Sequence, residues 1–208
     1  MSRQNRVDPE GSLIAVSARG SMMGNRGCLH DDRSNVIRTS ARDAWVTCLL
    51  DFKGRRRSLM QPGHYTELFF LDEATALAAG HRPCAECRRD RYGNYLDAWM
   101  RAFGLAKRPT AKEVDAELKR ERGQLSSPGQ HDVAALPTGT FLKDGTTGDF
   151  FVVAAGRLMR WSFDGYLAAN PAEVASRRLA VVTPACHVAV LHAGYVPALH
   201  PSVGLGPA

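Results

Sequence analysis

The sequence of 208 residues predicts an α+β fold, in which a small N-terminal module of strands and helices precedes a small β-rich domain. Three observations support this. Helical periodicity lies in the middle of the chain, short β-branched and aromatic runs lie on both sides of it, and glycines separate the later runs. We expect the module to span residues 1–104, a charged helix with a linker residues 105–136, and the β-rich domain residues 137–208.

The N-terminal elements are predicted from β-rich runs and turn residues. Residues 1–44 are rich in Gly, Asn, Asp and Arg, so we expect them to be mostly irregular. Residues 45–52 predict a strand, residues 53–54 a turn, and residues 55–60 the return strand of a hairpin. After Pro62-Gly63, a further short strand is expected from Tyr65 to Leu71.

Two helices are predicted in the middle of the chain. Asp72 is a suitable N-cap for a helix over residues 73–79, and Gly80 is suited to the position after its end. A second helix is expected from about Asp90 to Phe103, because its apolar residues recur at helical spacing. These residues are Tyr92, Tyr95, Leu96, Trp99, Met100 and Phe103. They indicate a face that packs against a core.

The second half begins with a helix signal and continues with short strands. Thr110 and Glu113 match a capping box, which predicts a surface helix over residues 111–122, followed by a linker to residue 137. The β-rich runs are residues 150–153, 157–161 and 179–182. Separated by glycine turns, they predict a small antiparallel sheet or barrel. A last helix is expected over residues 185–193, between Pro184 and Gly194.

Cys84 and Cys87 form a Cys-x-x-Cys pair shortly after Gly80. Two thiolates three positions apart can ligate one zinc ion, which prefers about four tetrahedral nitrogen and sulfur ligands. Pro83 stiffens the approach to the first thiol. Neighbouring arginines favour the thiolate form, because positive charge lowers the pKa of a thiol. Zn²⁺ is therefore the expected cofactor.

The remaining ligands come from a short set of candidates. Cys28 and Cys48 rank first, because thiolates are the most frequent partners of a structural Cys-x-x-Cys pair. His30 lies two residues from Cys28 and can substitute for Cys28 or Cys48. The less favoured candidates are His64 and His81. Cys186 is interpreted as a buried apolar residue.

Composition limits the compartment and the partners. No run of about 18 apolar residues is present, so no membrane partner is expected. The polar start of the chain lacks the apolar core of a signal peptide, which favours the cytoplasm. Five cysteines, an odd number, favour metal over disulfides in that reducing compartment.

The net charge of +6 lies entirely in the first half of the chain. Residues 1–110 hold 18 Lys and Arg against 12 Asp and Glu, whereas residues 111–208 hold 9 of each. An Arg-rich surface fits the phosphates of nucleic acid, with DNA favoured over RNA, although a solubilising surface is the other interpretation. The predicted nucleic-acid contacts are Arg55, Arg57, Arg82, Arg88 and Arg89.

The segment from Phe69 to Cys87 resembles the metal-binding domain of the bacterial Ada DNA-repair protein. The shared features are an aromatic strand end, an Ala-rich helix and a Gly-x-Arg-Pro-Cys-x-x-Cys string, over about residues 66–90. The resemblance implies an Ada-like zinc fold that binds DNA, with Cys84 and Cys87 as the second ligand pair, and transfer of a methyl group to a zinc-bound cysteine. The family's first pair, Cys-x-x-x-Cys, is absent, and His81 stands where the family has an aromatic residue.

Two enzyme classes share parts of these motifs. A zinc deaminase also carries Pro-Cys-x-x-Cys, but it needs an upstream His-x-Glu or Cys-x-Glu. The stretch from His64 to Glu67 has one residue too many, and Glu67 fits a solvent-facing strand position. The residues around Cys186 are similar to the Pro-Cys-His-Arg-Val site of DNA alkyltransferases. They contain an additional alanine and lack the arginine, so helix packing explains Cys186 better.

A zinc-dependent nuclease is a further alternative, together with a methyl or alkyl acceptor. His30, Asp31, Asp32 and His64 are the residues that would serve a nuclease, since histidine activates water and carboxylates hold Mg²⁺. In the competing interpretation His30 ligates zinc and the two aspartates cap a turn. The last alternative is a protein-interaction module in which zinc is purely structural.

Overall fold

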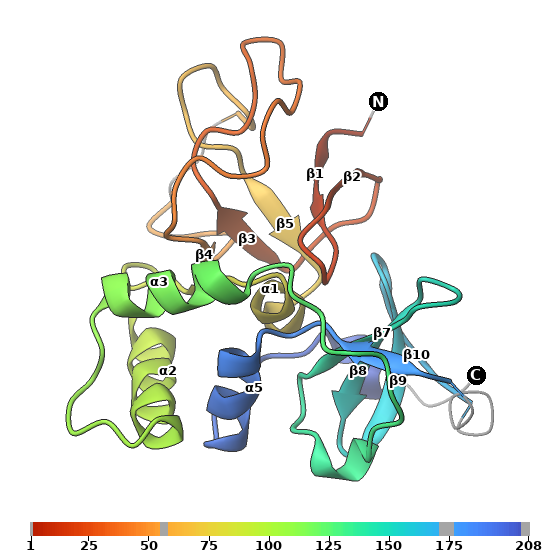
Figure 1. Ribbon diagram of the computed structural model, residues 1–208. Coiled ribbons are helices and arrows are strands. Elements are labelled where there is room, and N and C mark those ends of the chain that lie inside the picture. Colours follow the sequence, from red (N-terminus) through yellow and green to blue (C-terminus); the bar gives the residue numbers. More distant parts are fainter. Residues whose placement is uncertain (1, 55–57, 171–176, 205–208) are drawn as a thin grey trace.

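The computed structural model describes residues 2–54, 58–170 and 177–204. It contains two sheets, with helices grouped between and beside them (Figure 1). The strands of the first sheet are β1 (Gln4–Val7), β2 (Leu13–Ala15), β3 (Met22–Asn25), β4 (Val46–Cys48), β5 (Leu68–Phe70) and β6 (Arg82–Pro83). Those of the second are β7 (Phe141–Asp144), β8 (Phe150–Ala154), β9 (Arg157–Ser162), β10 (Gly165–Ala168) and β11 (Leu179–Val181). The predicted α+β class is confirmed.

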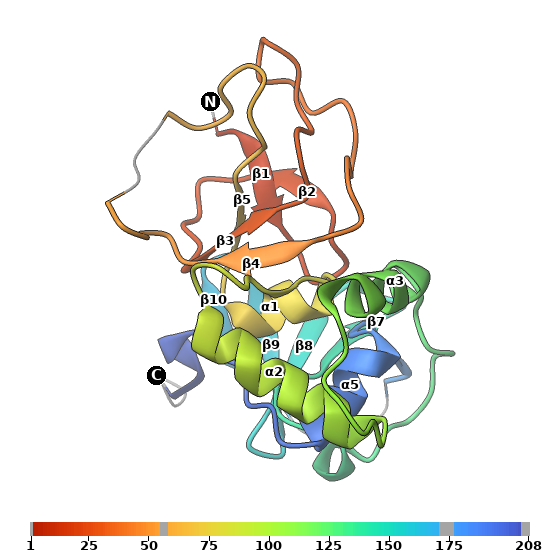
Figure 2. The same cartoon turned by 90° about the vertical axis from the view of Figure 1, so that its left-hand side faces the viewer.

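The helices are short and lie below the first sheet in both ribbon views (Figures 1 and 2). They are α1 (Glu73–Ala78), α2 (Arg89–Ala102), α3 (Ala111–Glu121) and α5 (Ala185–His192), with 3₁₀ turns η1 (Val133–Ala135) and η2 (Pro201–Gly204). Helix α1 lies between the two sheets. No helix in the described part of the chain combines the length and the apolar character needed to cross a membrane.

The first sheet has the strand order β2-β1-β5-β3-β4-β6 and mixes parallel with antiparallel pairs. The prediction that residues 1–44 are mostly irregular is wrong in part, because β1, β2 and β3 supply half of the strands. Each has only three or four residues, and β1 has the sequence Gln-Asn-Arg-Val, with one apolar residue. Alternation of apolar and polar residues over so few positions gives no strand signal. In the structure, β5 lies between β1 and β3 and pairs with both.

The hairpin predicted over residues 45–60 is not observed. The strand of the first half shortens to β4, and the residues from Ser58 to Met60 form no strand. Met60 is instead buried, with its backbone N–H donating to the Glu67 carboxylate at 2.8 Å. Arg55 to Arg57, where the return strand was expected, lie outside the described residues. Strand β4 pairs with β3 and β6 instead.

Helix α1 begins and ends as the sequence predicts. The Asp72 carboxylate accepts from the backbone N–H of Thr75, and Gly80 follows the helix with φ +78°. The N–H groups of Gly80 and His81 return to the carbonyls of Leu77 and Ala76, which is a Schellman ending. This turn aims the chain directly into β6 and the Cys-x-x-Cys pair.

Helices α2, α3 and α5 match their predicted ranges within about two residues. The capping box of Thr110 and Glu113 is present at the start of α3. As predicted, α3 lies at the surface, and its two large apolar residues, Val114 and Leu118, are fully buried against α2 and α5. Two apolar residues one turn apart are sufficient to dock a helix whose other faces remain exposed.

The second sheet is antiparallel throughout, with the order β10-β9-β8-β7-β11. The prediction of a small antiparallel sheet is confirmed. The sequence analysis placed no strands at β7 and β10, which flank glycine turns.

The hydrophobic core does not divide at the predicted linker over residues 105–136. One cluster joins Tyr95 and Trp99 of α2 with Val190 of α5, and another joins Ala74 of α1 with Phe141 of β7. The helices therefore pack both halves of the chain together.

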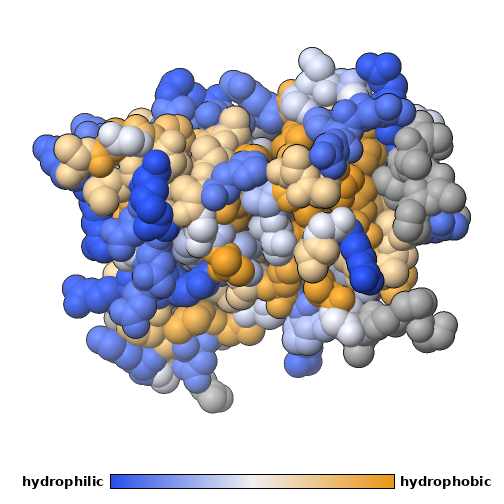
Figure 3. All heavy atoms as spheres, turned by 90° about the horizontal axis from the view of Figure 1, so that it is seen from below, coloured by the Kyte–Doolittle hydropathy of each residue, from blue (hydrophilic) through white to orange (hydrophobic). Residues whose placement is uncertain are grey.

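Seen from below, apolar surface forms several patches separated by hydrophilic side chains (Figure 3).

Candidate metal centre

Three cysteines converge where β4 and β6 run side by side. The two strands pair in parallel, with Val46 opposite Arg82 and Thr47 opposite Pro83, which brings Cys48 level with Cys84. The backbone N–H of Cys84 donates to the carbonyl of Thr47 at 2.9 Å, and Cys87 lies in the turn before α2. The Sγ atoms of Cys48, Cys84 and Cys87 all lie within 4.8 Å of one another, close enough to bind one metal ion.

Backbone N–H groups orient these sulfurs. The N–H of Glu86 donates to Cys84 Sγ at 3.4 Å, and that of Leu49 is directed at Cys87. The N–H of Arg88 returns to the carbonyl of Cys84 at 3.1 Å and leads the chain into α2. Hydrogen bonds of this kind favour the thiolate, which is the form that ligates metal.

The three thiols differ in pKa. A hydrogen bond from Cys48, together with the backbone N–H groups of Cys87 and Glu86, lowers the pKa of Cys84 to about 5. The bond to Cys84 and burial raise the pKa of Cys48, and burial raises that of Cys87. Binding of a cation to all three thiolates therefore releases protons from Cys48 and Cys87, and it strengthens as the pH rises.

Cys28 is not part of the cluster, which corrects the predicted set of four cysteines. Strands β3 and β4 are antiparallel, with Met23 opposite Cys48, so Cys28 lies five residues further along the chain in the direction away from Cys48. Its Sγ is 3.5 Å from the carbonyl oxygen of His30. The sequence analysis ranked Cys28 and Cys48 together, because no local pattern reports the strand pairing that brings Cys48 to the cluster and leaves Cys28 apart.

His30 does not join the thiols either. Its ring is buried, with Nδ1 2.6 Å from the Thr66 hydroxyl and Nε2 3.1 Å from the Gln61 carbonyl. Both ring nitrogens therefore have partners, and the predicted substitution of His30 for a cysteine is not supported. Asp31 accepts from the backbone N–H groups of Arg33 and Asn35, so it caps a turn, as the competing interpretation expected of both Asp31 and Asp32.

His81, one of the less favoured candidate ligands, lies in the hydrophobic core. It is fully buried against Phe70 and Trp45, and Arg26 Nε donates to its Nε2 at 3.1 Å. Burial, with the charges of Arg26 and Arg122, holds its pKa well below the usual value. The ring is therefore neutral and packed away from the thiols.

Two residues named in the enzyme alternatives are also buried. Glu67 is 2% exposed and accepts from the backbone N–H of Met60, so its expected solvent-facing position is wrong. Cys186 is buried in the α2–α3–α5 cluster, as predicted. His64 is exposed in a turn.

The part of the chain that the structure describes contains one group of three side chains that could hold a metal ion, formed by Cys48, Cys84 and Cys87.

Comparison of the chain with family models, with curated proteins and with solved structures finds no match. The chemistry of the centre is therefore argued from its own residues.

The arginines around the Cys-x-x-Cys pair have mostly internal partners. Arg82 forms a buried, two-pronged ion pair with Asp115 of α3 at 2.8 Å, and Arg88 pairs with the fully buried Glu73 at 2.8 Å. The prediction that Arg82 and Arg88 contact phosphates at the surface is therefore wrong. Arg89 is exposed. The remaining predicted contacts, Arg55 and Arg57, lie outside the described residues.

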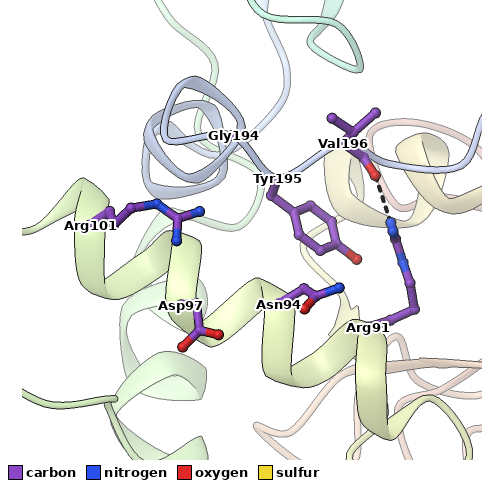
Figure 4. A pocket seen from close by; sticks show the side chains of 7 residues that line it. All are labelled: Arg91, Asn94, Asp97, Arg101, Gly194, Tyr195 and Val196. Atoms are coloured by element: carbon purple, nitrogen blue, oxygen red, sulfur yellow. Dashed lines mark hydrogen bonds between the residues drawn. The ribbon is translucent and has the colours of Figure 1, made fainter.

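A surface pocket of about 280 Å³ lies along α2, and none of the three cysteines lines it (Figure 4). Its lining residues are Arg91, Asn94, Asp97, Arg101, Gly194, Tyr195 and Val196. The charged ones are engaged: Arg91 with Glu73 and the Val196 carbonyl, Arg101 with the Ala193 carbonyl, and Asp97 with Arg108. This lining offers no nucleophile beside a base, so the cysteine cluster remains the candidate site.

Proposed function

We propose that this protein binds one zinc ion through Cys48, Cys84 and Cys87. The observation that supports the proposal is the convergence of three Sγ atoms within 4.8 Å. Tetrahedral zinc with Zn–S bonds of about 2.3 Å separates its sulfurs by about 3.8 Å, so small side-chain rotations suffice. The backbone N–H groups around Cys84 and Cys87 support the thiolate form.

The proposed ion would link the end of β4 to the Cys84–Cys87 turn, which follows 36 residues later in the sequence. Cys48 ends β4, Cys84 follows β6, and Cys87 precedes α2. Strand β6 has only two residues and pairs with β4 alone. Zinc would therefore stabilise the edge of the first sheet and the start of α2, because metal binding free energy is also folding free energy.

The test is the metal content of purified protein and of single-cysteine variants. Replacing Cys48, Cys84 or Cys87 by Ser should remove bound zinc. Each protein is loaded with zinc and separated from free zinc by gel filtration, and its zinc content is measured by inductively coupled plasma mass spectrometry. Cys28→Ser is the matched control and should retain one zinc ion per chain. A wild-type protein without zinc would refute the proposal, and loss of zinc in Cys28→Ser would restore the four-cysteine set.

Nucleic-acid binding is the second candidate function, and DNA is the favoured partner. Support comes from the excess positive charge of residues 1–110, from exposed Arg89 five residues after Cys84, and from the Ada-like string. Each phosphate contact releases counterions, so affinity should fall with salt.

Fluorescence anisotropy with labelled DNA and RNA across a salt series tests the second candidate. Arg89→Ala and a double Arg55→Ala/Arg57→Ala variant should weaken binding and reduce the salt slope. Arg157→Ala, an exposed change on β9, should have no effect. Absence of binding at low salt would leave the zinc centre with a structural or protein-interaction role.

A further inference from the structure

The described part of the chain brings three thiols to the proposed zinc centre and no fourth ligand. No other cysteine, histidine, aspartate or glutamate there has a ligand atom within 4.8 Å of all three sulfurs. The ligands that the sequence offered are held elsewhere: Cys28 near the His30 carbonyl, and His81 inside the core. Zinc prefers four ligands, and sites with three protein ligands keep a position for an exchangeable one.

The surroundings of the thiols are accessible to solvent. Cys48, Cys84 and Cys87 are themselves half-buried. Leu49 and Leu50, which follow Cys48, are 39% and 52% exposed, and Ala85 between the other two cysteines is exposed. A small molecule can therefore approach the centre from outside, where the exposed Leu49 and Leu50 directly follow Cys48 in the chain.

We propose that the fourth coordination position of this centre takes an external small thiol, with its carbon chain against Leu49 and Leu50. The proposal rests on zinc binding by the three cysteines. Sulfur matches a three-thiolate site in softness, and a fourth thiolate gives the common four-sulfur ligand set. Water and alcohols offer oxygen, a harder donor that matches a three-thiolate site less well.

Coordination is a ligand exchange without oxidation or reduction. The thiol sulfur forms a bond to the metal, the water molecule that held the fourth position leaves, and the thiol proton passes to solvent. The sulfur stays bound as a thiolate at neutral pH, because a nearby cation lowers the pKa of a thiol.

Cobalt(II) replaces zinc in the experiment, since its visible spectrum reports coordination number and its near-ultraviolet charge-transfer band reports bound thiolates. The probe is β-mercaptoethanol, and ethylene glycol is the matched control with oxygen in place of sulfur. Addition of the thiol should raise the charge-transfer absorbance saturably by about one third, as three thiolates become four. Ethylene glycol should leave the spectrum unchanged, and cobalt should stay with the protein.

Three outcomes would overturn the proposal. A spectrum insensitive to thiol would show that the chain supplies the fourth ligand. So would a changed starting spectrum in Cys28→Ser, or in Asp51→Asn or Glu86→Gln, which alter the carboxylates nearest in sequence to the three cysteines. Removal of cobalt by the thiol would show that the centre is not stable with an external ligand. Failure of the wild-type protein to bind cobalt or zinc at all is a separate result, which refutes zinc binding itself.

Discussion

The stability of this protein should fall in mild acid because His187 is buried in its neutral form. Its Nδ1 donates to the carbonyl of Leu77 at 2.9 Å, and its Nε2 lies 2.9 Å from the Tyr95 hydroxyl, which donates to it. The imidazole thus joins α5 to α1 and α2 with 1% of its surface exposed. A second proton on Nε2 would replace an accepting nitrogen with a donor and place a charge in the core.

The expected loss of stability follows from the difference between the pKa of His187 in the folded and unfolded protein. Burial lowers the pKa of His187 from 6.5 to about 4. Between these values the unfolded chain binds a proton that the folded protein excludes, so folding is favoured above about pH 6.5 and loses stability as the pH falls. The full drop in pKa corresponds to about 3 kcal/mol, approached near pH 4 at about 1.4 kcal/mol for each pH unit.

The assay is urea unfolding of the wild type, of His187→Gln and of His192→Gln at a series of pH values. His192 is exposed on the same helix and serves as the control. His187→Gln is expected to lower stability at neutral pH but to show the smaller loss on acidification. Parallel pH profiles for wild type and His187→Gln would refute the assignment of a neutral, buried imidazole.

Three further changes test particular contacts, each through the denaturation midpoint. Arg82→Met should lower the free energy of unfolding by about 3–5 kcal/mol, because it leaves Asp115 buried without its partner. The double change Arg82→Met with Asp115→Leu should recover part of this loss. Equal losses in the single and double variants would contradict the ion pair. Gly80→Ala should cost about 1–3 kcal/mol, because φ is +78° and the new Cβ would lie 2.6 Å from Arg122 Cγ. Thr110→Ala should cost about 1 kcal/mol by removing the capping box, and an unchanged midpoint would show that the cap is dispensable.

Sequence reasoning succeeded where the signal is local. Asp72 and Gly80 mark the two ends of α1 within nine residues, and Thr110 with Glu113 marks the start of α3. Periodic apolar residues placed α2. These signals work because capping and helical spacing depend on neighbours three or four positions away.

It failed where distant pairing decides the outcome. The choice between Cys48 and Cys28 depends on the parallel pairing of β4 with β6, which no local pattern reports. The charge of Arg82 was visible, but its partner Asp115 is 33 residues away, so a buried ion pair was mistaken for a surface contact. Strand β1 lies between nearby β2 and β5, which follows more than 60 residues later, and its own residues carry almost no apolar pattern.

The two carboxylates at the start of α1 have consequences for synthesis of the chain. Glu73 accepts hydrogen bonds from Tyr195 and from the backbone of Ala198, and Asp72 accepts from the backbone of His200. During translation, the segment with the three cysteines leaves the ribosome more than 100 residues before these partners. A nascent chain can therefore assemble its thiols early, but Asp72 and Glu73 remain without these partners until residues 195–200 emerge. We expect final folding to follow translation and truncation before residue 195 to yield protein that cells degrade.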